Sequence, residues 1–275
     1  MSSLLRDLFG VSKPIIAMVH LRALPGRPAH DRAAGMRPVV DAVARDLGTL
    51  QDAGVDGLLF CNEADLPYQL GVGEEVAAAM AAVIGELRAG LRLPFGVDLV
   101  WDPMASLAVA RATGASFVRD VFTGAYESDL GVMRPGLGAI GAYRSAIGAG
   151  AVALFGNITP EFASPLAARD LAQRARSAAY VGVDAILISG PITGTPTDTA
   201  QLDAAKAALP DIPVLANTGV TAGTVREILA RCDGAIVGTD LKVGGVTWNP
   251  VDPGRAAEFM TSARAARESA VAGHG

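Results

Sequence analysis

The chain has 275 residues, of which 51% are hydrophobic, 5% aromatic and 19% charged. Such a chain can bury a large core, which excludes a disordered or fibrous protein. Lys and Arg number 23 against 28 Asp and Glu, so the formal net charge is −5 and no basic surface is available for nucleic acid. The longest uncharged run, 145–160, is shorter than the roughly 18 apolar residues of a spanning helix, so we expect no membrane insertion.

The two ends of the chain differ in character. The first ten residues have apolar positions interrupted by Arg6 and Asp7, without the continuous apolar stretch of a secretory signal. We expect a short helical turn at 3–10 that covers one end of the domain, and a flexible tail at 268–275. Cys61 and Cys232 lie in or beside apolar runs without a CxxC partner. They predict reduced core thiols in a cytoplasmic protein, with a reactive nucleophile as the alternative.

Eight short apolar runs alternate with alanine-rich segments of helical period. Near-continuous apolar runs are typical of parallel strands buried on both faces. The predicted strands are 14–20, 55–61, 94–100, 116–121, 151–157, 183–189, 212–217 and 233–238. The predicted helices are 37–53, 72–89, 103–113, 137–147, 165–181, 197–209, 221–231 and 253–267.

Eight strand-helix units in this length predict an α/β protein with a (β/α)8 TIM barrel. A doubly wound sheet is the alternative, but no Gly-x-Gly-x-x-Gly loop follows the first strand. No linker or low-complexity segment divides the chain, so we expect one domain over 1–275. The fourth connection, 122–150, is the least regular of the eight.

In a TIM barrel the active site lies at the carboxyl ends of the strands. His20 ends the first predicted strand, and an imidazole suits proton transfer, although a structural role is nearly as well supported. Converging carboxylates can hold Mg²⁺ or carry out acid-base chemistry, and they can also form plain ion pairs. The expected catalytic residues are His20, Glu63, Asp98, Arg119 and Asp120, and Glu63, Asp98 and Asp120 are the candidates for a Mg²⁺ site.

Small-residue loops follow the last three strands. Their backbone N–H groups can hold an anion, and barrels often bind a phosphate after strands seven and eight. Alternatively, these glycines only close tight turns. The expected phosphate-binding residues are Gly190, Thr193, Gly194, Thr218, Gly219, Gly238 and Thr239. Further polar residues at strand ends are expected to contact the substrate, namely Arg22, Asn62, Asn157, Asn217 and Lys242.

Four segments carry a resemblance to a known family. They are PIIAMVHLRALPG at 14–26, GASFVRDVFTGAYESDLGVM at 114–133, ILISGPITGTP at 186–196 and DGAIVGTDLKVGG at 233–245. In this order along the chain they resemble the BtpA/SgcQ family. The resemblance implies a phosphate-binding type of TIM barrel, with some members described as photosystem I biogenesis factors and others encoded among sugar-utilisation genes.

The chain departs from the family pattern at the rim. Family members tend to have Glu-Asn where this chain has Asn62 and Glu63, and Asn near Asp120. They also tend to have Lys-His near 155–157 and Gly-Ser-Gly at 217–219. The departures indicate a divergent member with a different substrate or one that has lost the ancestral reaction.

Together these features favour an enzyme that acts on a phosphorylated small molecule, most plausibly a sugar phosphate, by proton transfer in an isomerase, epimerase or lyase step. The alternatives are a non-catalytic assembly factor and a metal-assisted hydrolase. Whether the chain forms a homo-oligomer is open from the sequence.

Overall fold

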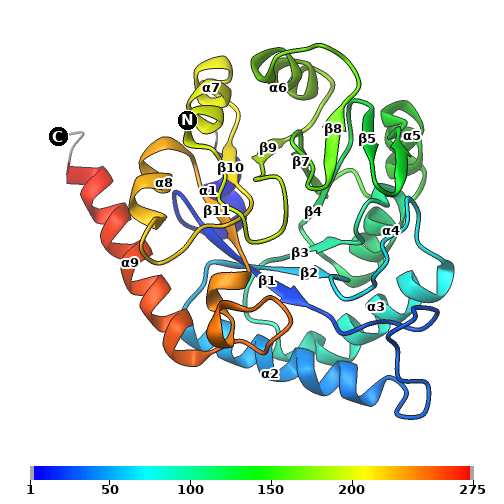
Figure 1. Cartoon of the computed structure of the whole chain (residues 1–275). Helices are drawn as coiled ribbons and strands as arrows, with labels where there is room; N and C mark the ends of the chain where they lie inside the picture. Colours follow the sequence, from blue (N-terminus) through cyan, green and yellow to red (C-terminus); the bar gives the residue numbers. More distant parts are fainter. Residues whose placement is uncertain (1–2, 273–275) are drawn as a thin grey trace.

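A computed structural model describes residues 3–272 of the chain (Figure 1). Eight parallel strands close into a barrel in the order β1-β11-β10-β9-β7-β4-β3-β2, which confirms the predicted (β/α)8 fold. The barrel strands are β1 (Ile15–His20), β2 (Gly57–Cys61), β3 (Phe95–Asp98), β4 (Phe117–Asp120), β7 (Ala153–Asn157), β9 (Ala185–Ile188), β10 (Val214–Ala216) and β11 (Ala235–Val237).

A ring of helices surrounds the barrel (Figure 1). Its members are α2 (Arg37–Ala53), α3 (Glu74–Leu87), α4 (Pro103–Thr113), α5 (Leu137–Ala146), α6 (Leu171–Tyr180), α7 (Thr199–Ala208), α8 (Val225–Arg231) and α9 (Pro253–Ala272). Short 3-10 turns lie at η1 (Arg88–Gly90), η2 (Thr239–Leu241) and η3 (Val243–Gly245). None of the helices within 3–272 is long and apolar enough to cross a membrane.

Strand residues alternate between two apolar layers, as the period of two requires. One set, with Ile15, Ala17 and Val19 from β1, packs against the helices, while Ile16 and Met18 point into the barrel. Apolar side chains from every barrel strand except β3 fill the interior. In β3, Gly96 leaves room for the ring of Phe117. The barrel is therefore a packed core, and ligands are restricted to its two ends.

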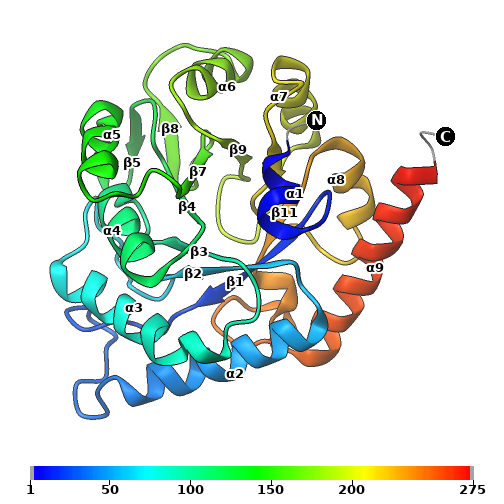
Figure 2. The same ribbon diagram turned by 180° about the vertical axis from the view of Figure 1, so that it is seen from behind.

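Helix α1 (Leu4–Phe9) lies across the amino-terminal end of the barrel, as Figure 2 shows from behind. Its Leu5 and Phe9 are buried in the interior cluster. The Phe9 ring meets the rings of Phe117 and Phe155 edge to face, with centroids 5.6 and 6.5 Å apart. This end is closed, so the carboxyl ends of the strands form the open mouth.

Two regions differ from the sequence expectations. The irregular connection after β4 forms β5 (Tyr126–Ser128) and β6 (Gly131–Met133), which join β8 (Ala163–Pro165) in a small antiparallel sheet. Helix α6, which was predicted to begin at residue 165, begins after Asp170, because residue 165 belongs to β8. At the other end, α9 continues to Ala272, into the segment 268–275 expected to be a flexible tail, and 273–275 lie outside the described residues.

Candidate active site

Strand parity places a set of polar side chains inside the mouth. His20, Arg119 and Asn157 each follow an inward-facing residue of the same strand by two positions, so they point inward too. Asp98 faces inward beside them, because Gly96, two residues earlier, lies against the Phe117 ring. The top layer of the barrel is polar, whereas the layers below it are apolar.

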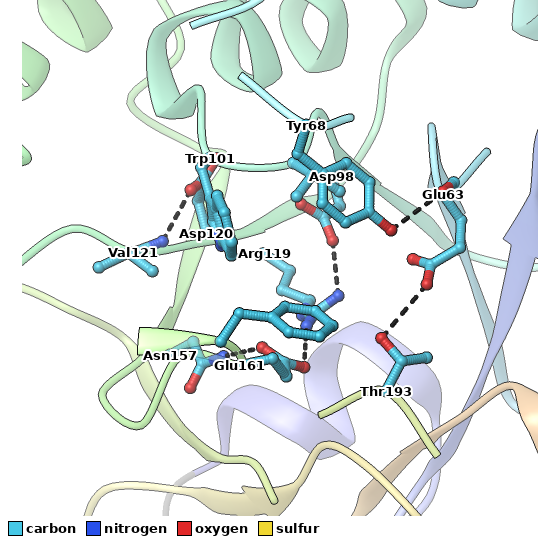
Figure 3. A pocket seen from close by; sticks show the side chains of 12 residues that line it. Glu63, Tyr68, Asp98, Trp101, Arg119, Asp120, Val121, Asn157, Glu161 and Thr193 are labelled. Carbon is cyan, nitrogen blue, oxygen red and sulfur yellow. Dashed lines mark hydrogen bonds and ion pairs between the residues drawn. The ribbon is translucent and has the colours of Figure 1, made fainter. Parts of the chain in front are cut away.

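Arg119 lies at the centre of this layer between two carboxylates (Figure 3). Its Nη1 is 2.6 Å from Oδ2 of Asp98, and its Nη2 is 2.8 Å from Oε1 of Glu161. All three side chains are nearly inaccessible, with exposed fractions of 14%, 5% and 8%. Burial raises the pKa of Asp98 and outweighs the opposing effect of Arg119. Two carboxyls share one guanidinium here, so the cluster carries excess negative charge when both are ionised.

Glu63 faces the same space without a cationic partner among the described residues (Figure 3). Its Oε1 accepts a hydrogen bond from Thr193 Oγ1 at 3.3 Å, and its Oε2 lies 3.7 Å from Cys61 Sγ. Tyr68 donates its hydroxyl to the Glu63 carbonyl at 3.0 Å and so holds the backbone in place. Burial raises the pKa of Glu63, and Arg119 opposes this shift only in part.

These groups line a hollow at the mouth. Its enclosed part measures about 30 Å³, and the whole hollow, including the part open to solvent, about 400 Å³. The enclosed volume holds about one water molecule, so a ligand at this site would lie mostly in the part open to solvent. The rings of Tyr68, Trp101 and Phe162 line it together with the carboxyl groups and Asn157.

His20 lies in the mouth beside Gly238, where an added Cβ would lie 3.0 Å from the imidazole Cε1. Burial lowers the pKa of His20 from 6.5 to about 3, and the positive charges of Lys242 and Arg119 add to this effect. The imidazole is therefore neutral at physiological pH. Its Nδ1 and the Oδ1 of Asn217 are buried and have no hydrogen-bond partner among the described residues.

Asp120 follows Arg119 and therefore points to the opposite face of β4, toward α4. Ser106 Oγ donates to it at 3.3 Å and the Val121 N–H at 2.7 Å. Asp120 still lines the hollow together with Glu63 and Asp98, but its carboxyl is held by donors on the α4 side. Among the described residues, no group of three or more His, Cys, Asp or Glu side chains could hold a metal ion. A requirement for Mg²⁺ stays a prediction.

The loop after β9 packs over the end of β10. A Cβ at Gly190 would lie 2.4 Å from the Thr195 carbonyl oxygen, and one at Gly219 would lie 2.3 Å from the Pro196 nitrogen. The Gly190 N–H donates to Thr218 Oγ1 at 2.6 Å. These contacts explain Gly190, Thr218 and Gly219 as packing residues, independently of any ligand.

The neighbouring loops still offer backbone donors. Ala222 N–H donates to Asp240 Oδ2 at 2.9 Å and joins the loops after β10 and β11. Thr239 Oγ1 lies 2.9 Å from Thr247 Oγ1, and a Cβ at Gly194 would be 3.4 Å from Thr239 Oγ1. Within the described part of the chain, no acceptor takes a hydrogen bond from the N–H groups of Gly219, Val220, Thr239 or Asp240.

Other predicted substrate contacts have structural partners. Lys242 is 1% exposed and its Nζ pairs with Oδ2 of Asp46 in α2 at 2.8 Å, so its ammonium is directed away from the mouth. Asn62 accepts from the Val100 N–H at 2.8 Å and donates to Asp65, which ties two loops together. Arg22 is exposed at the rim. Of the predicted substrate contacts, Asn157 and Asn217 lie in the mouth, where both donate to Ser189 Oγ.

The sequence profile of the BtpA family matches residues 11–265. The chain belongs to the BtpA family. It is 46% identical over 259 residues to the putative sgc region protein SgcQ of Escherichia coli, covering 94% of this chain and 97% of that one. It is 27% identical over 256 residues to the photosystem I biogenesis protein BtpA of Synechocystis, covering 92% and 88%.

Solved structures share the fold of this BtpA-family chain at low sequence identity. The native KDPGal structure aligns with a TM-score of 0.57 and 18% identity, over 93% of this chain and 96% of that one. The N-acetylmannosamine-6-phosphate 2-epimerase of Clostridium perfringens aligns with a TM-score of 0.55 and 14% identity, over 88% and 90%. These likenesses establish the TIM barrel and leave the reaction of the BtpA-family chain open.

Four residues at the mouth of the BtpA-family chain are not predicted from its sequence, namely Glu161, Tyr68, Trp101 and Phe162. Glu161 pairs with Arg119, which lies 42 positions earlier in the sequence, and no local sequence pattern reveals this contact. The three aromatic residues lie in loops, where hydrophobic periodicity carries no information. One signal was available, because large aromatic side chains in βα loops of a barrel are placed at the mouth.

Proposed function

We propose that this BtpA-family protein is an enzyme that moves a proton at a carbon next to a carbonyl group of a phosphorylated sugar, in an isomerase, epimerase or lyase step. One observation carries the proposal. Glu63 is a buried carboxyl with a raised pKa and no ion-pair partner among the described residues, and it faces a guanidinium across an open hollow. A raised carboxyl pKa suits a group that must both accept and donate a proton near neutral pH.

We assign the steps of this reaction to different side chains of the protein. Glu63 removes the proton from carbon, and the charge that develops on the carbonyl oxygen is stabilised by Arg119, which Asp98 and Glu161 hold rigid. Glu63 then returns the proton to carbon, or the enolate expels the hydroxyl group of the next carbon, which takes the proton from Glu63 and leaves as water. Neutral His20 is not among the residues that line this hollow, so its predicted part in proton transfer stays a prediction.

The phosphate is proposed to bind at the loops after β10 and β11. The N–H groups of Gly219, Val220, Thr239 and Asp240 supply donors without a fixed positive charge. Two proteins of the same fold have phosphorylated sugars in their names, the 2-epimerase above and the phosphoribosyl anthranilate isomerase of Thermus thermophilus. This likeness supports the choice of substrate class.

Proton transfer can be tested without knowing the product. The protein is incubated in D₂O with a panel of aldose and ketose phosphates, and deuterium uptake at carbon is followed by NMR. We expect uptake with at least one member and a loss of about 10²-fold or more in Glu63→Gln. Glu258→Gln, an exposed carboxylate on α9, is the matched control and should leave uptake unchanged.

Uptake that survives in Glu63→Gln would refute the role of this carboxyl. No uptake with any member of the panel would refute the proposed proton transfer. Thermal unfolding of each variant distinguishes loss of the reaction from loss of the fold.

A further inference from the structure

Three aromatic rings from three different loops meet over the hollow. Tyr68 follows β2, Trp101 follows β3 and Phe162 follows β7. The Tyr68 and Trp101 ring centroids are 5.8 Å apart, and those of Trp101 and Phe162 are 6.5 Å apart, both pairs edge to face. These three residues form a continuous aromatic wall, and each lines the hollow.

The backbone of this wall is strained. Trp101 has a φ of 64° and Phe162 a φ of 59°, in the left-handed region that bulky residues avoid. Among the described residues, Lys13 is the one other non-glycine residue with positive φ. Strain of this kind persists only where surrounding contacts hold it in place, and it is concentrated at ligand-binding sites.

Specific contacts hold the two strained residues in place. On either side of Trp101, the Val100 N–H donates to Asn62 Oδ1 at 2.8 Å and the Asp102 N–H donates to the Leu99 carbonyl at 2.7 Å. The Phe162 N–H donates to the Pro191 carbonyl at 2.9 Å. Phe162 also follows Glu161, so the residue that fixes Arg119 and the residue that completes the wall share one turn.

The same hollow is also lined by polar groups. It presents carboxyl oxygens of Glu63 and Glu161, the Arg119 guanidinium and the amide of Asn157. A ligand bound against these groups would present hydroxyl groups to the polar side chains and a rigid apolar face to the rings. A closed sugar ring has both, because its axial C–H bonds form an apolar face that packs on the electron-rich face of an aromatic ring. An open-chain sugar has no such face.

We propose that the aromatic wall of Tyr68, Trp101 and Phe162 is the specificity-determining element of this site and selects sugar phosphates bound as closed rings. The inference rests on the proposed function, because it names the form of the substrate that the site takes. It also assigns Asn62 as a positioning residue, which acts on the ligand through the backbone next to Trp101.

The chain contains two tryptophans, so one substitution makes Trp101 the sole fluorescent reporter. In Trp248→Phe, binding is followed by fluorescence with ring-locked 1,5-anhydrohexitol 6-phosphates of the gluco, manno and galacto series. The open-chain hexitol 6-phosphates of the same series are titrated in parallel. We expect at least one ring-locked compound to change the Trp101 emission and to bind about tenfold or more tightly than its open-chain counterpart.

Ring removal should then weaken binding of that ring-locked compound. By calorimetry, Trp101→Leu and Phe162→Leu are expected to weaken it about tenfold, while Trp101→Phe and Phe162→Tyr, which keep a ring, retain most of the affinity. Asn62→Ala should lower the affinity and also change the emission of Trp101 in the free protein, because it removes the acceptor for the Val100 N–H next to Trp101. Circular dichroism confirms that each variant is folded.

The inference is overturned if open-chain compounds bind as tightly as ring-locked ones, if neither series binds, or if the Leu variants keep full affinity. These failures differ from failure of the proposed function. Deuterium uptake without ring preference would remove this inference alone, whereas Trp101-dependent ring binding without any deuterium uptake would remove the proton-transfer proposal alone.

Discussion

Asp98 and Asp120 each end a barrel strand, and their surroundings give them different roles. Asp98 faces the mouth and binds Arg119, whereas Asp120 is buried on the helix side among neutral donors. Burial raises the pKa of Asp120 well above its ordinary value, and the nearby Asp98 charge adds to the shift. The native state therefore favours the protonated form of Asp120.

This shift fixes the sign of a pH-dependent stability effect. A carboxyl with a raised native pKa contributes most stability below its unfolded pKa and loses that contribution as the pH rises through the native value. Asp120→Asn keeps the acceptor for Val121 and removes the charge. We expect it to raise the free energy of unfolding by on the order of 1 kcal/mol at pH 8 and by much less at pH 4, measured by urea denaturation.

Asp98→Asn is the matched comparison for Asp120→Asn. Arg119 keeps Glu161 as its partner, and the loss of the hydrogen bond to Asp98 is opposed by the removal of a buried carboxyl with a raised pKa. We therefore expect a smaller change in the unfolding free energy at pH 8 than for Asp120→Asn. A loss of stability in Asp120→Asn at pH 8 would show that Asp120 is ionised and stabilised in the native state.

For single residues, the sequence predicts which residues end a strand. It does not predict on which face of the strand each side chain lies. Asp98, Arg119 and Asp120 could be selected because they end predicted strands, but which of them face the mouth depends on where each strand joins the barrel. Lys242 illustrates a second limit, since its partner Asp46 lies 196 positions away on α2. Such a contact depends on the closed barrel and leaves no local trace.

At the scale of elements, strands and helices with a clear period were predictable, and the small sheet was not. The strands β5, β6 and β8 are three residues each, too short for a periodic signal. The true start of α6 had a signal, because Asp170 and Gln173 form a reciprocal capping box. Helix α2 was placed correctly because its apolar stripe is regular and Gly54 ends it in the left-handed conformation.

Helix α1 packs against strand β2 at Gly57. A Cβ at Gly57 would lie 2.5 Å from Cε1 of Phe9, so the Phe9 ring occupies the place of a side chain at the base of the barrel. Phe9→Ala should lower the unfolding free energy by about 3–5 kcal/mol, because it empties a packed site. Gly57→Ala should lower it by about 1–3 kcal/mol through overpacking.

The double variant tests this fit. In Phe9→Ala the methyl group of Gly57→Ala enters vacated space, so the second substitution should become neutral or stabilising. Urea denaturation of all four proteins gives the coupling energy directly. Additive losses would mean that Phe9 and Gly57 do not share one space.

At the scale of the whole molecule, the high apolar content is explained by two cores, one inside the barrel and one between the strands and helices. The net charge of −5 has a different consequence. A negatively charged protein repels an anionic substrate at long range, and the proposed phosphate loops attract it only at short range through backbone N–H groups. Salt should therefore favour binding, since it screens the repulsion and leaves short hydrogen bonds intact.

Inorganic phosphate is the simplest probe of this balance. We expect its dissociation constant, measured by phosphorus NMR at pH 8, to fall about two- to fivefold as ionic strength rises from about 10 to about 150 mM. Variants Asp7→Asn and Glu268→Gln lower the negative charge at the closed end of the barrel, so together they should reduce this salt effect without altering affinity at high salt. A site built from Lys or Arg side chains would give the opposite trend, with binding weakened by salt, and that result would exclude the backbone loops as the main source of attraction.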